Sequence, residues 1–435
     1  MANGSAPRVA ALALLCSLVF PAHAENLLDV YFVAEQQEPT LRSAAAARQA
    51  ARERHKQSIA NLLPQADLTA SARSSSVEYG DFSTEDTGLG YGVSLTQPIY
   101  HHDSYKLMAQ TRSGIQQSDA EFEAAQRNLM IRVAERYFTA LAVQDNLDFV
   151  RAEKEAVGRQ LEQTRQRFEV GLIAVTDVHE SQAAYDVTVA SEIAAENAVS
   201  GAREALRELS GRYHDSLSRL VENLPLTPPE PADVKSWVDT ALSTNYSLQA
   251  TRTQVEIARD ELRRQQAGHY PALDLIGQYN YLEDGGPTYN DLSVSNTLVM
   301  LQLSVPISRG GGTMARAGEA RYRLDQSLET LEQTTRNIHR QVKDAYLSVL
   351  ASISQVKALE QALVSTQSAL TASEAGLEVG TRTTVDVLTT RRELFRAQRD
   401  HARARYDYIL SLLRLKEAAG TLAIADFEEL VQWLN

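Results

Sequence analysis

The chain has 435 residues, with 56 acidic and 43 basic side chains and a formal net charge of −13 at pH 7. An acidic surface repels phosphate backbones, so this balance argues against nucleic acid as a partner. The one cysteine, Cys16, lies in an N-terminal apolar run, so the rest of the chain has no thiol for a disulfide or a cysteine metal site.

The N-terminus has the pattern of a secretory signal peptide. Arg8 provides a positive start, residues 9–20 form an uncharged apolar run, and Ala-His-Ala at 22–24 fits a cleavage site of small residues. An apolar run of about a dozen residues is too short to cross a bilayer as a helix. We therefore expect residues 1–24 to be removed during export.

A helix and a pair of strands are predicted next. Residues 25–63 are rich in Ala, Arg, Gln and Glu and favour one helix, which Pro64 ends because proline cannot continue the hydrogen-bond ladder. The period then changes to two, with apolar and polar residues alternating on both sides of a polar stretch at 78–88. We expect a strand pair at 65–100 with that stretch as its loop.

A very long helical hairpin follows the strands. Residues 103–169 contain no proline, and their apolar residues recur at coiled-coil spacing. Such a helix is a rod of about 100 Å, which cannot bury its apolar stripe alone. A glycine and several β-branched residues then interrupt the pattern, so we expect a tip near 171–178 and a returning helix over 178–211.

The second half of the chain repeats this arrangement. Gly171 corresponds to Gly380, and Asp177 to Asp386, at one constant offset, which indicates an internal duplication. We divide the chain into a first repeat (25–223), a proline-rich linker (224–232), a second repeat (233–422) and a C-terminal tail (423–435). In the second repeat we predict a helix at 233–268 and a strand pair at 272–307. Two long helices follow, at 316–378 and 387–420, with a tip between them at 380–387.

The predicted strands are long enough to cross an outer membrane, which takes about 9–11 tilted residues. Tyrosines cluster near the strand ends, as in the aromatic belts of membrane proteins. Four strands cannot close a barrel, and open sheet edges are not tolerated in lipid. Several chains must then combine, and three are the smallest comfortable closure, with twelve strands and twelve helices. The alternative is a pair of amphipathic hairpins on a soluble protein.

The most specific stretch of the sequence is 380–388, which reads Gly-Thr-Arg-Thr-Thr-Val-Asp-Val-Leu and is followed by Ala-Arg-Tyr-Asp-Tyr at 404–408. Together with the first tip and the strand pairs framed by prolines, it resembles the TolC family of outer-membrane efflux and secretion channels. The resemblance covers essentially the whole mature chain. It is closer to the TolC branch than to the lipidated multidrug branch, since the residues before Cys16 do not fit a lipid-attachment site.

The resemblance implies a fold, a location and partners. The fold is a membrane β-barrel joined to a long α-helical barrel, both completed by a homotrimer, in the outer membrane of a Gram-negative bacterium and extending into the periplasm. The partners are outer-membrane lipid, a periplasmic adaptor (membrane fusion protein) and an inner-membrane transporter of RND, ABC or MFS type. The function implied is the exit duct of an efflux pump or type I secretion system. The alternative is a periplasmic coiled-coil scaffold or adaptor.

The resemblance also implies a gate at the tips. Carried over by position, the polar links between neighbouring hairpins involve Thr176, Asp177 and Arg382. A physical argument supports this independently, because a basic and an acidic residue at crowded tips can form a charge-assisted, switchable pair. The alternative is an exposed ion pair worth about 0–1 kcal/mol.

Asp386 is predicted to line the constriction of the tunnel. A ring of identical carboxylates repels itself, raises some of their pKa values and attracts cations. The alternative is a solvent-facing helical Asp without such a role. The chain departs from the family at Leu377, where the family has a tyrosine that adds to the gate, and at Thr389, where it has a second acidic ring. We expect a gate with fewer links or with apolar contacts, and weaker cation selectivity.

Two tripeptides at the tips match the family's adaptor-binding motifs. They are Val170, Gly171 and Leu172 at the first tip and Val379, Gly380 and Thr381 at the second. Each glycine also permits the turn itself, and the two roles are compatible.

The sequence predicts neither an enzyme nor a cofactor. The glycine-rich stretch at 308–313 follows a strand and opens a helix, but it lacks the Lys-Ser/Thr ending of a phosphate loop. His101, His102 and Asp103 give a weak metal signal, for which a polar anchor at the end of the barrel is the better interpretation.

Overall fold

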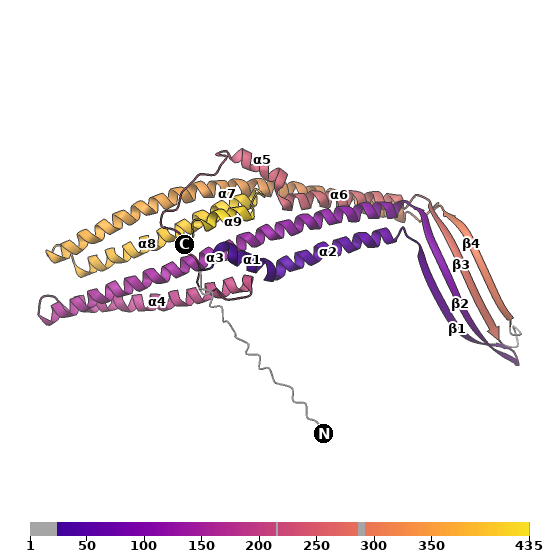
Figure 1. Ribbon diagram of the computed structural model, residues 1–435, viewed down its shortest axis with the longest axis horizontal. Coiled ribbons are helices and arrows are strands. Elements are labelled where there is room, and N and C mark those ends of the chain that lie inside the picture. Colours follow the sequence, from indigo (N-terminus) through magenta and orange to yellow (C-terminus); the bar gives the residue numbers. More distant parts are fainter. Residues whose placement is uncertain (1–23, 215, 286–291, 435) are drawn as a thin grey trace, which may run out of the picture.

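The computed structural model describes residues 24–214, 216–285 and 292–434, so the predicted signal peptide lies outside the described residues except for Ala24. The molecule is elongated, with a β-sheet at one end and two long helical hairpins reaching to the other (Figure 1). Short helices lie near the middle of its length. Among the described helices, none has an apolar window long enough to cross a membrane.

The opening helix is divided in two, in contrast to the single helix predicted over 25–63. Helix α1 spans Leu27–Gln37 and helix α2 spans Pro39–Ala60. Between them Glu38 is extended (φ −69°, ψ 122°), and its carboxylate accepts a hydrogen bond from the Leu41 amide at 2.7 Å. Pro39 is the first residue of α2, where its missing N–H costs nothing. The prediction overlooked this start signal.

The second repeat contains the same break, so the single helix predicted at 233–268 is also two. Helix α5 spans Val234–Thr244 and helix α6 spans Tyr246–Ala267. Asn245 is extended between them, and its side chain accepts a hydrogen bond from the Leu248 amide at 3.1 Å. An N-cap side chain thus starts the second helix in both repeats.

The four strands form one antiparallel sheet in the order β1-β2-β3-β4. They are β1 (Gln65–Tyr79), β2 (Phe82–His101), β3 (Ala272–Gly285) and β4 (Leu292–Ser304). The loop predicted at 78–88 is wrong, since paired strands continue through it until Tyr79 pairs with Phe82 around Gly80, whose φ is +61°. The polar residues there do not prevent strand pairing, because an antiparallel ladder needs only backbone groups.

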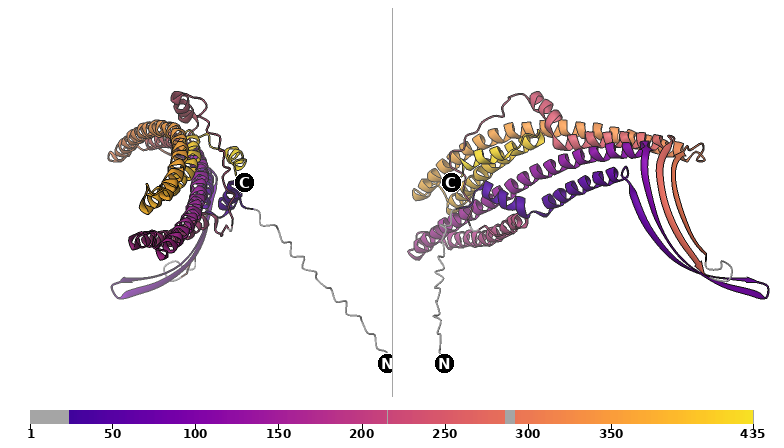
Figure 2. Two further views of the ribbon diagram at one scale, coloured as in Figure 1. Left: turned by 90° about the vertical axis from the view of Figure 1, so that its left-hand side faces the viewer. Right: turned by 45° about the vertical axis from the view of Figure 1, so that its right-hand side comes forward.

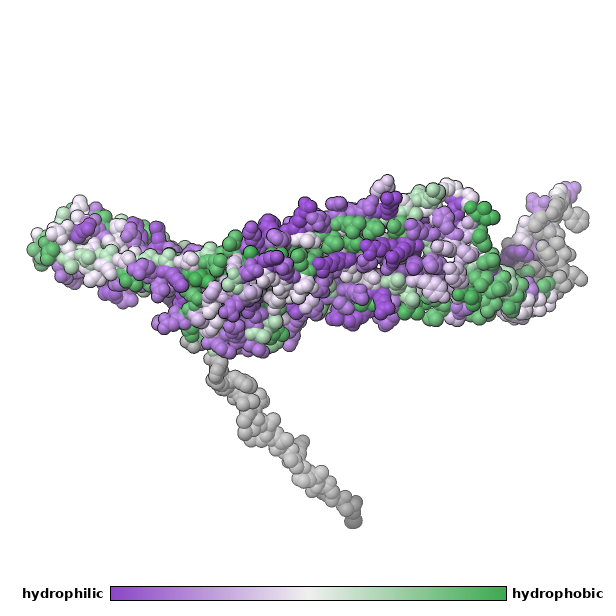
Figure 3. Space-filling model, turned by 90° about the horizontal axis from the view of Figure 1, so that it is seen from above, coloured by the Kyte–Doolittle hydropathy of each residue, from purple (hydrophilic) through white to green (hydrophobic). Residues whose placement is uncertain are grey.

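One face of the sheet carries apolar side chains in rows that run from strand to strand. Leu68 pairs with Val93, Val93 with Tyr279, and Tyr279 with Thr297. Directly opposed residues of an antiparallel pair project from the same face. In the adjacent row the rings of Tyr91 and Tyr281 stack at 5.0 Å. Apolar residues accordingly gather near the strand end of the molecule (Figure 3). On β1, Leu68 is 76% exposed.

The long helices are α3 (His102–Glu169), α4 (Val175–Ser210), α7 (Gly312–Glu378) and α8 (Thr384–Ala418). Helix α3 packs against α2 and α6 toward the sheet and against α4 and α8 toward the tips. Helix α7 packs against α6 and then against α8. Four helical columns therefore lie side by side along the whole length of the helical part: α2, α3, α6 and α7 near the sheet, and α4, α3, α8 and α7 near the tips. Together they curve into an arc (Figure 2).

The columns follow the order of the strands. Strand β1 continues α2, β2 leads into α3, β3 continues α6, and β4 precedes α7. One side of the arc is therefore formed by β1, α2 and α4, and the other side by β4 and α7. The two sides differ, and both edge strands of the sheet lack a neighbour on one side.

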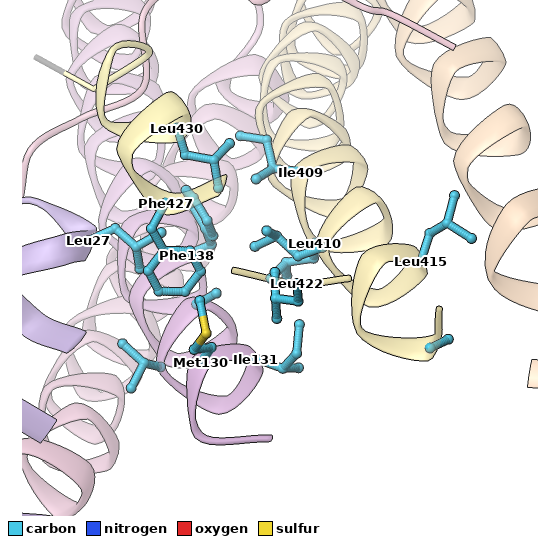
Figure 4. Packing of buried hydrophobic residues seen from close by; sticks show 14 of the residues in the cluster. Leu27, Met130, Ile131, Phe138, Ile409, Leu410, Leu415, Leu422, Phe427 and Leu430 are labelled. Carbon is cyan, nitrogen blue, oxygen red and sulfur yellow. The ribbon is translucent and has the colours of Figure 1, made fainter. Parts of the chain in front are cut away.

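The main hydrophobic core lies at mid-length, where the short helices cover the long ones. The segment predicted as a tail, 423–435, contains helix α9 (Ile424–Val431). Its Phe427 is fully buried and meets the ring of Tyr31 on α1 edge to face at 5.6 Å. Figure 4 shows this cluster, in which side chains of α1, α3, α8, α9 and the loop between α8 and α9 converge: Leu27, Met130, Phe138, Ile409, Leu410, Leu422, Phe427 and Leu430.

Candidate functional site: the helical tips and the contacts between hairpins

The first tip is a tight turn built on Gly171. Its φ is +76°, a left-handed conformation that glycine adopts at no steric cost. The Gly171 amide donates to the Phe168 carbonyl oxygen at 2.8 Å, and the Leu172 amide donates to that of Arg167 at 2.9 Å. The apolar flanks of the turn are open to solvent, with Val170 70% and Leu172 72% exposed.

The second tip repeats this turn around Gly380, whose φ is +77°. The Thr381 and Arg382 amides donate to the Gly376 carbonyl oxygen at 2.8 and 3.2 Å. A Cβ placed on Gly376 would lie 2.6 Å from Cγ of Arg382, so the bare glycine lets the arginine side chain fold back over α7. Sequence analysis overlooked Gly376. Val379 on this tip is 76% exposed.

Asp386 belongs to a capping box that starts α8. Its Oδ2 accepts hydrogen bonds from the backbone N–H and the hydroxyl of Thr383, both at 2.9 Å, and its own amide donates to the Thr383 hydroxyl oxygen at 3.2 Å. The backbone N–H of Thr383, its hydroxyl and the nearby Arg382 guanidinium hold the pKa of Asp386 below its ordinary value. The side chain remains partly exposed, so the carboxylate is charged and faces the solvent at the tip.

The structure does not bring the predicted gate residues together within one chain. Thr176, Asp177 and Arg382 lie on separate tips at the same end of the molecule (Figure 1). Among the described residues, no hydrogen bond or ion pair joins the Asp177 carboxylate to Arg382 or to another side chain. Both are therefore available to groups outside the chain.

The two departures from the family pattern have distinct surroundings. Leu377 is partly buried and packs against an apolar cluster within its own hairpin, formed by Leu370, Val387 and Leu394. It thus strengthens the packing of α7 on α8. Thr389 lies on the face of α8 that borders a groove between α4 and α8.

Sequence analysis missed a row of polar contacts that ties α8 to α3. Four side chains of α8, about two turns apart, reach α3. Arg391 donates to the Ala156 carbonyl oxygen at 3.0 Å, and Arg399 to the Glu153 carboxylate at 3.0 Å. Further from the tip, Tyr406 donates to Asp145 at 2.6 Å and Arg414 to Glu135 at 2.7 Å. Three arginines and a tyrosine at this spacing on one helix were the available signal.

The Tyr406–Asp145 contact is the most buried of these polar contacts. Burial raises the pKa of the Asp145 carboxyl, and the hydrogen bond from Tyr406 opposes that rise. Burial, together with the adjacent carboxylate, also raises the pKa of Tyr406, so the phenol stays protonated and donates. The row holds the two hairpins together from mid-length to Arg391, and the tips beyond it are free of such contacts in the described chain.

A family model described as outer membrane efflux protein matches residues 30–212 and 237–421 of the chain. The outer membrane protein TolC of Vibrio cholerae is 40% identical over 426 residues, which cover 96% of this chain and 95% of that protein. The alkaline protease secretion protein AprF of Pseudomonas aeruginosa is 30% identical, covering 96% of this chain and 89% of that protein.

A solved structure has the same fold. The CmeC outer membrane channel of Campylobacter jejuni superimposes with a TM-score of 0.80 at 16% identity, covering 94% of this chain and 89% of the other. The predicted fold class is thereby confirmed at the level of one chain, with a four-stranded sheet joined to long helical hairpins in two repeats, and the closure of the barrels by further copies stays a prediction.

Proposed function

The chain belongs to the outer membrane efflux protein family, and we propose on that premise that three copies form a single duct through the outer membrane and periplasm. The protein is an outer-membrane exit channel for efflux and type I secretion. The finer assignments concern how copies assemble, which residues form the gate, and what docks on the tips.

The trimer is supported by the two unlike sides of the arc. A surface that pairs with a different surface on the next copy generates a ring when the rotation closes. The unpaired edges of β1 and β4 require partners in lipid, and each chain contributes four strands. Three chains then give a barrel of about twelve strands above a tube of four helical columns per chain.

The gate is formed by Thr176 and Asp177 of one hairpin and Arg382 of another, across the boundary between copies. The support is that these polar groups lie at the same end of the molecule without partners inside the described chain. Asp386 lines the constriction, because it lies in the first turn of α8 at the tip and its carboxylate stays charged at neutral pH. Three copies of it attract cations.

The exposed apolar tips receive the adaptor. Val170, Gly171 and Leu172 form one docking site, and Val379, Gly380 and Thr381 form the other. The exposed apolar side chains of Val170 and Leu172 on the first turn and of Val379 on the second support a protein contact there. The adaptor connects the duct to an inner-membrane transporter of RND, ABC or MFS type, and the duct performs no chemistry itself.

The experiment is purification of the mature chain from membranes in detergent, followed by electrophoresis without heating and by planar-bilayer recording. We expect a detergent-dependent trimer and cation-selective channels. A water-soluble particle in the periplasmic fraction that forms no channel would overturn the proposal in favour of the coiled-coil scaffold.

A further inference from the structure

A groove of about 840 Å³ runs between α4 and α8, with α3 as its floor. Its α4 wall is built from small apolar residues, among them Ala183, Ala184, Val187, Ala194 and Ala198. Its α8 wall carries Thr389, Arg392, Arg396 and Arg399. The volume is within the range of about 300–1,000 Å³ that small-molecule sites occupy.

The arginines of the α8 wall differ in what they contact. Arg399 is paired with Glu153 at 3.0 Å, and Arg391, on the neighbouring face, is paired with Glu374 at 2.6 Å. Arg392 and Arg396 are exposed, and no hydrogen bond or ion pair joins them to a side chain in the described ranges. They lie one turn apart on α8, so their guanidinium groups share the rim of the groove.

The opposite wall carries one carboxylate, Glu180 on α4. Because Glu153 is occupied by Arg399, the lining has two unpaired guanidinium groups against this single free carboxylate. A guanidinium is a planar, weakly hydrated cation that binds carboxylate, sulfonate and phosphate groups with two parallel hydrogen bonds.

We propose that this groove is a binding site for organic anions that have a flat apolar body, the body lying on the alanine wall of α4 and the anionic group bound by Arg392 and Arg396. The proposal rests on the proposed function in one respect, since the groove borders Thr389, one turn beyond Asp386, and so adjoins the constriction through which cargo would pass. It assigns to the duct a site for its cargo.

The test uses naphthalene-2-sulfonate as the probe, with 2-naphthol as the uncharged analogue and methanesulfonate as the anion without an apolar body. Binding to the detergent-solubilised protein is measured by isothermal titration calorimetry, and block of the channel is measured in planar bilayers. The variants are Arg392→Gln combined with Arg396→Gln, and, as a matched control, Arg403→Gln, an exposed arginine of α8 outside the groove.

We expect the naphthalene sulfonate to bind and to block, and the double variant to weaken both by about tenfold or more, as loss of charge-assisted hydrogen bonds implies. Arg403→Gln should leave both unchanged, and Glu180→Gln should strengthen binding by removing the competing carboxylate. Equal binding of methanesulfonate or of 2-naphthol would overturn the proposal, as would equal affinity in the double variant. If the protein binds naphthalene-2-sulfonate but forms no channels, the proposed duct is refuted and the proposed binding site is still supported.

Discussion

Arg399 of α8 and Glu153 of α3 form an ion pair between the two hairpins, with Nη1 of the arginine 3.0 Å from Oε2 of the glutamate. The Glu153 side chain is only 11% exposed, so little of it is open to water and Arg399 is its hydrogen-bond partner. The pair lies two turns beyond Arg391, the contact nearest the tips. It therefore belongs to the last part of the chain in which the hairpins are held together.

Replacing Arg399 should loosen the tip half of α8. Arg399→Met leaves a buried carboxylate without its hydrogen bond, at a cost of about 1–3 kcal/mol. We expect faster hydrogen–deuterium exchange of the α8 amides on the tip side of residue 399, measured by mass spectrometry. Arg403→Met is the control, because Arg403 is exposed and its weak contact with Asp407 spans 3.8 Å. Equal exchange in both variants would mean that the buried pair does not hold the hairpins.

Removing the basic member of the proposed gate should open the channel. Arg382→Ser deletes the cation that we propose links hairpins of neighbouring copies, so a trimer would lose three such links at once. We expect a higher single-channel conductance in planar bilayers, and a similar rise for Asp177→Asn. The double variant should conduct no more than either single variant, since both remove one interaction. Conductance at the wild-type level in Arg382→Ser would exclude both residues from the gate.

The carboxylate of Asp386 should determine cation preference. Asp386→Asn removes the charge but keeps an oxygen that can accept the Thr383 hydrogen bonds. We expect the reversal potential in a salt gradient to shift toward that of a channel that does not distinguish cations from anions. Asp29→Asn is the matched control, because Asp29 fills the same capping-box position in α1 with Asn26. An unaltered reversal potential in Asp386→Asn would refute the proposal that Asp386 lines the constriction.

The pH dependence of that selectivity follows from the lowered pKa of Asp386. A carboxyl group whose pKa is lower in the folded state stabilises the folded state at any pH above its ordinary pKa. This stabilisation is lost as the pH falls through the pKa of the folded state. We expect cation preference and the capped tip to persist from neutral pH down to the ordinary value of 3.8. Reversal potentials recorded along an acid titration provide the check. A midpoint well above 3.8 would mean that repulsion among the copies outweighs the capping hydrogen bonds.

Tyrosines at corresponding positions of the two repeats should respond differently to loss of the hydroxyl. Tyr137 is buried, and its hydroxyl is 2.9 Å from the Ser218 carbonyl oxygen and 3.1 Å from that of Glu25. Tyr346 makes no such bond in the described chain. Tyr137→Phe should cost about 1–3 kcal/mol and expose the segment near Glu25 to limited proteolysis. Tyr346→Phe should change little, and equal proteolysis of the two variants would contradict this.

Several features could be read from the sequence because they depend on neighbours along the chain. The change of period at Pro64, the length of α3 and the turns at Gly171 and Gly380 are local properties of backbone and side chains. The breaks at Glu38 and Asn245 were also readable, from the proline and the capping side chains that start α2 and α6. They were missed because strong helical composition on both sides dominated the pattern.

The tertiary structure decided which distant groups meet. Pairing of β2 with β3 joins two hairpins into one sheet, and the partners of Arg391, Arg399 and Tyr406 come from α3, far away in sequence. Periodicity shows that a helix has an apolar stripe but not which helix covers it, because any complementary stripe can do so. Because the structure holds one chain, no hydrogen bond or ion pair of Asp177 or Arg382 to a side chain is found within the described residues, and their partners across copies stay a proposal.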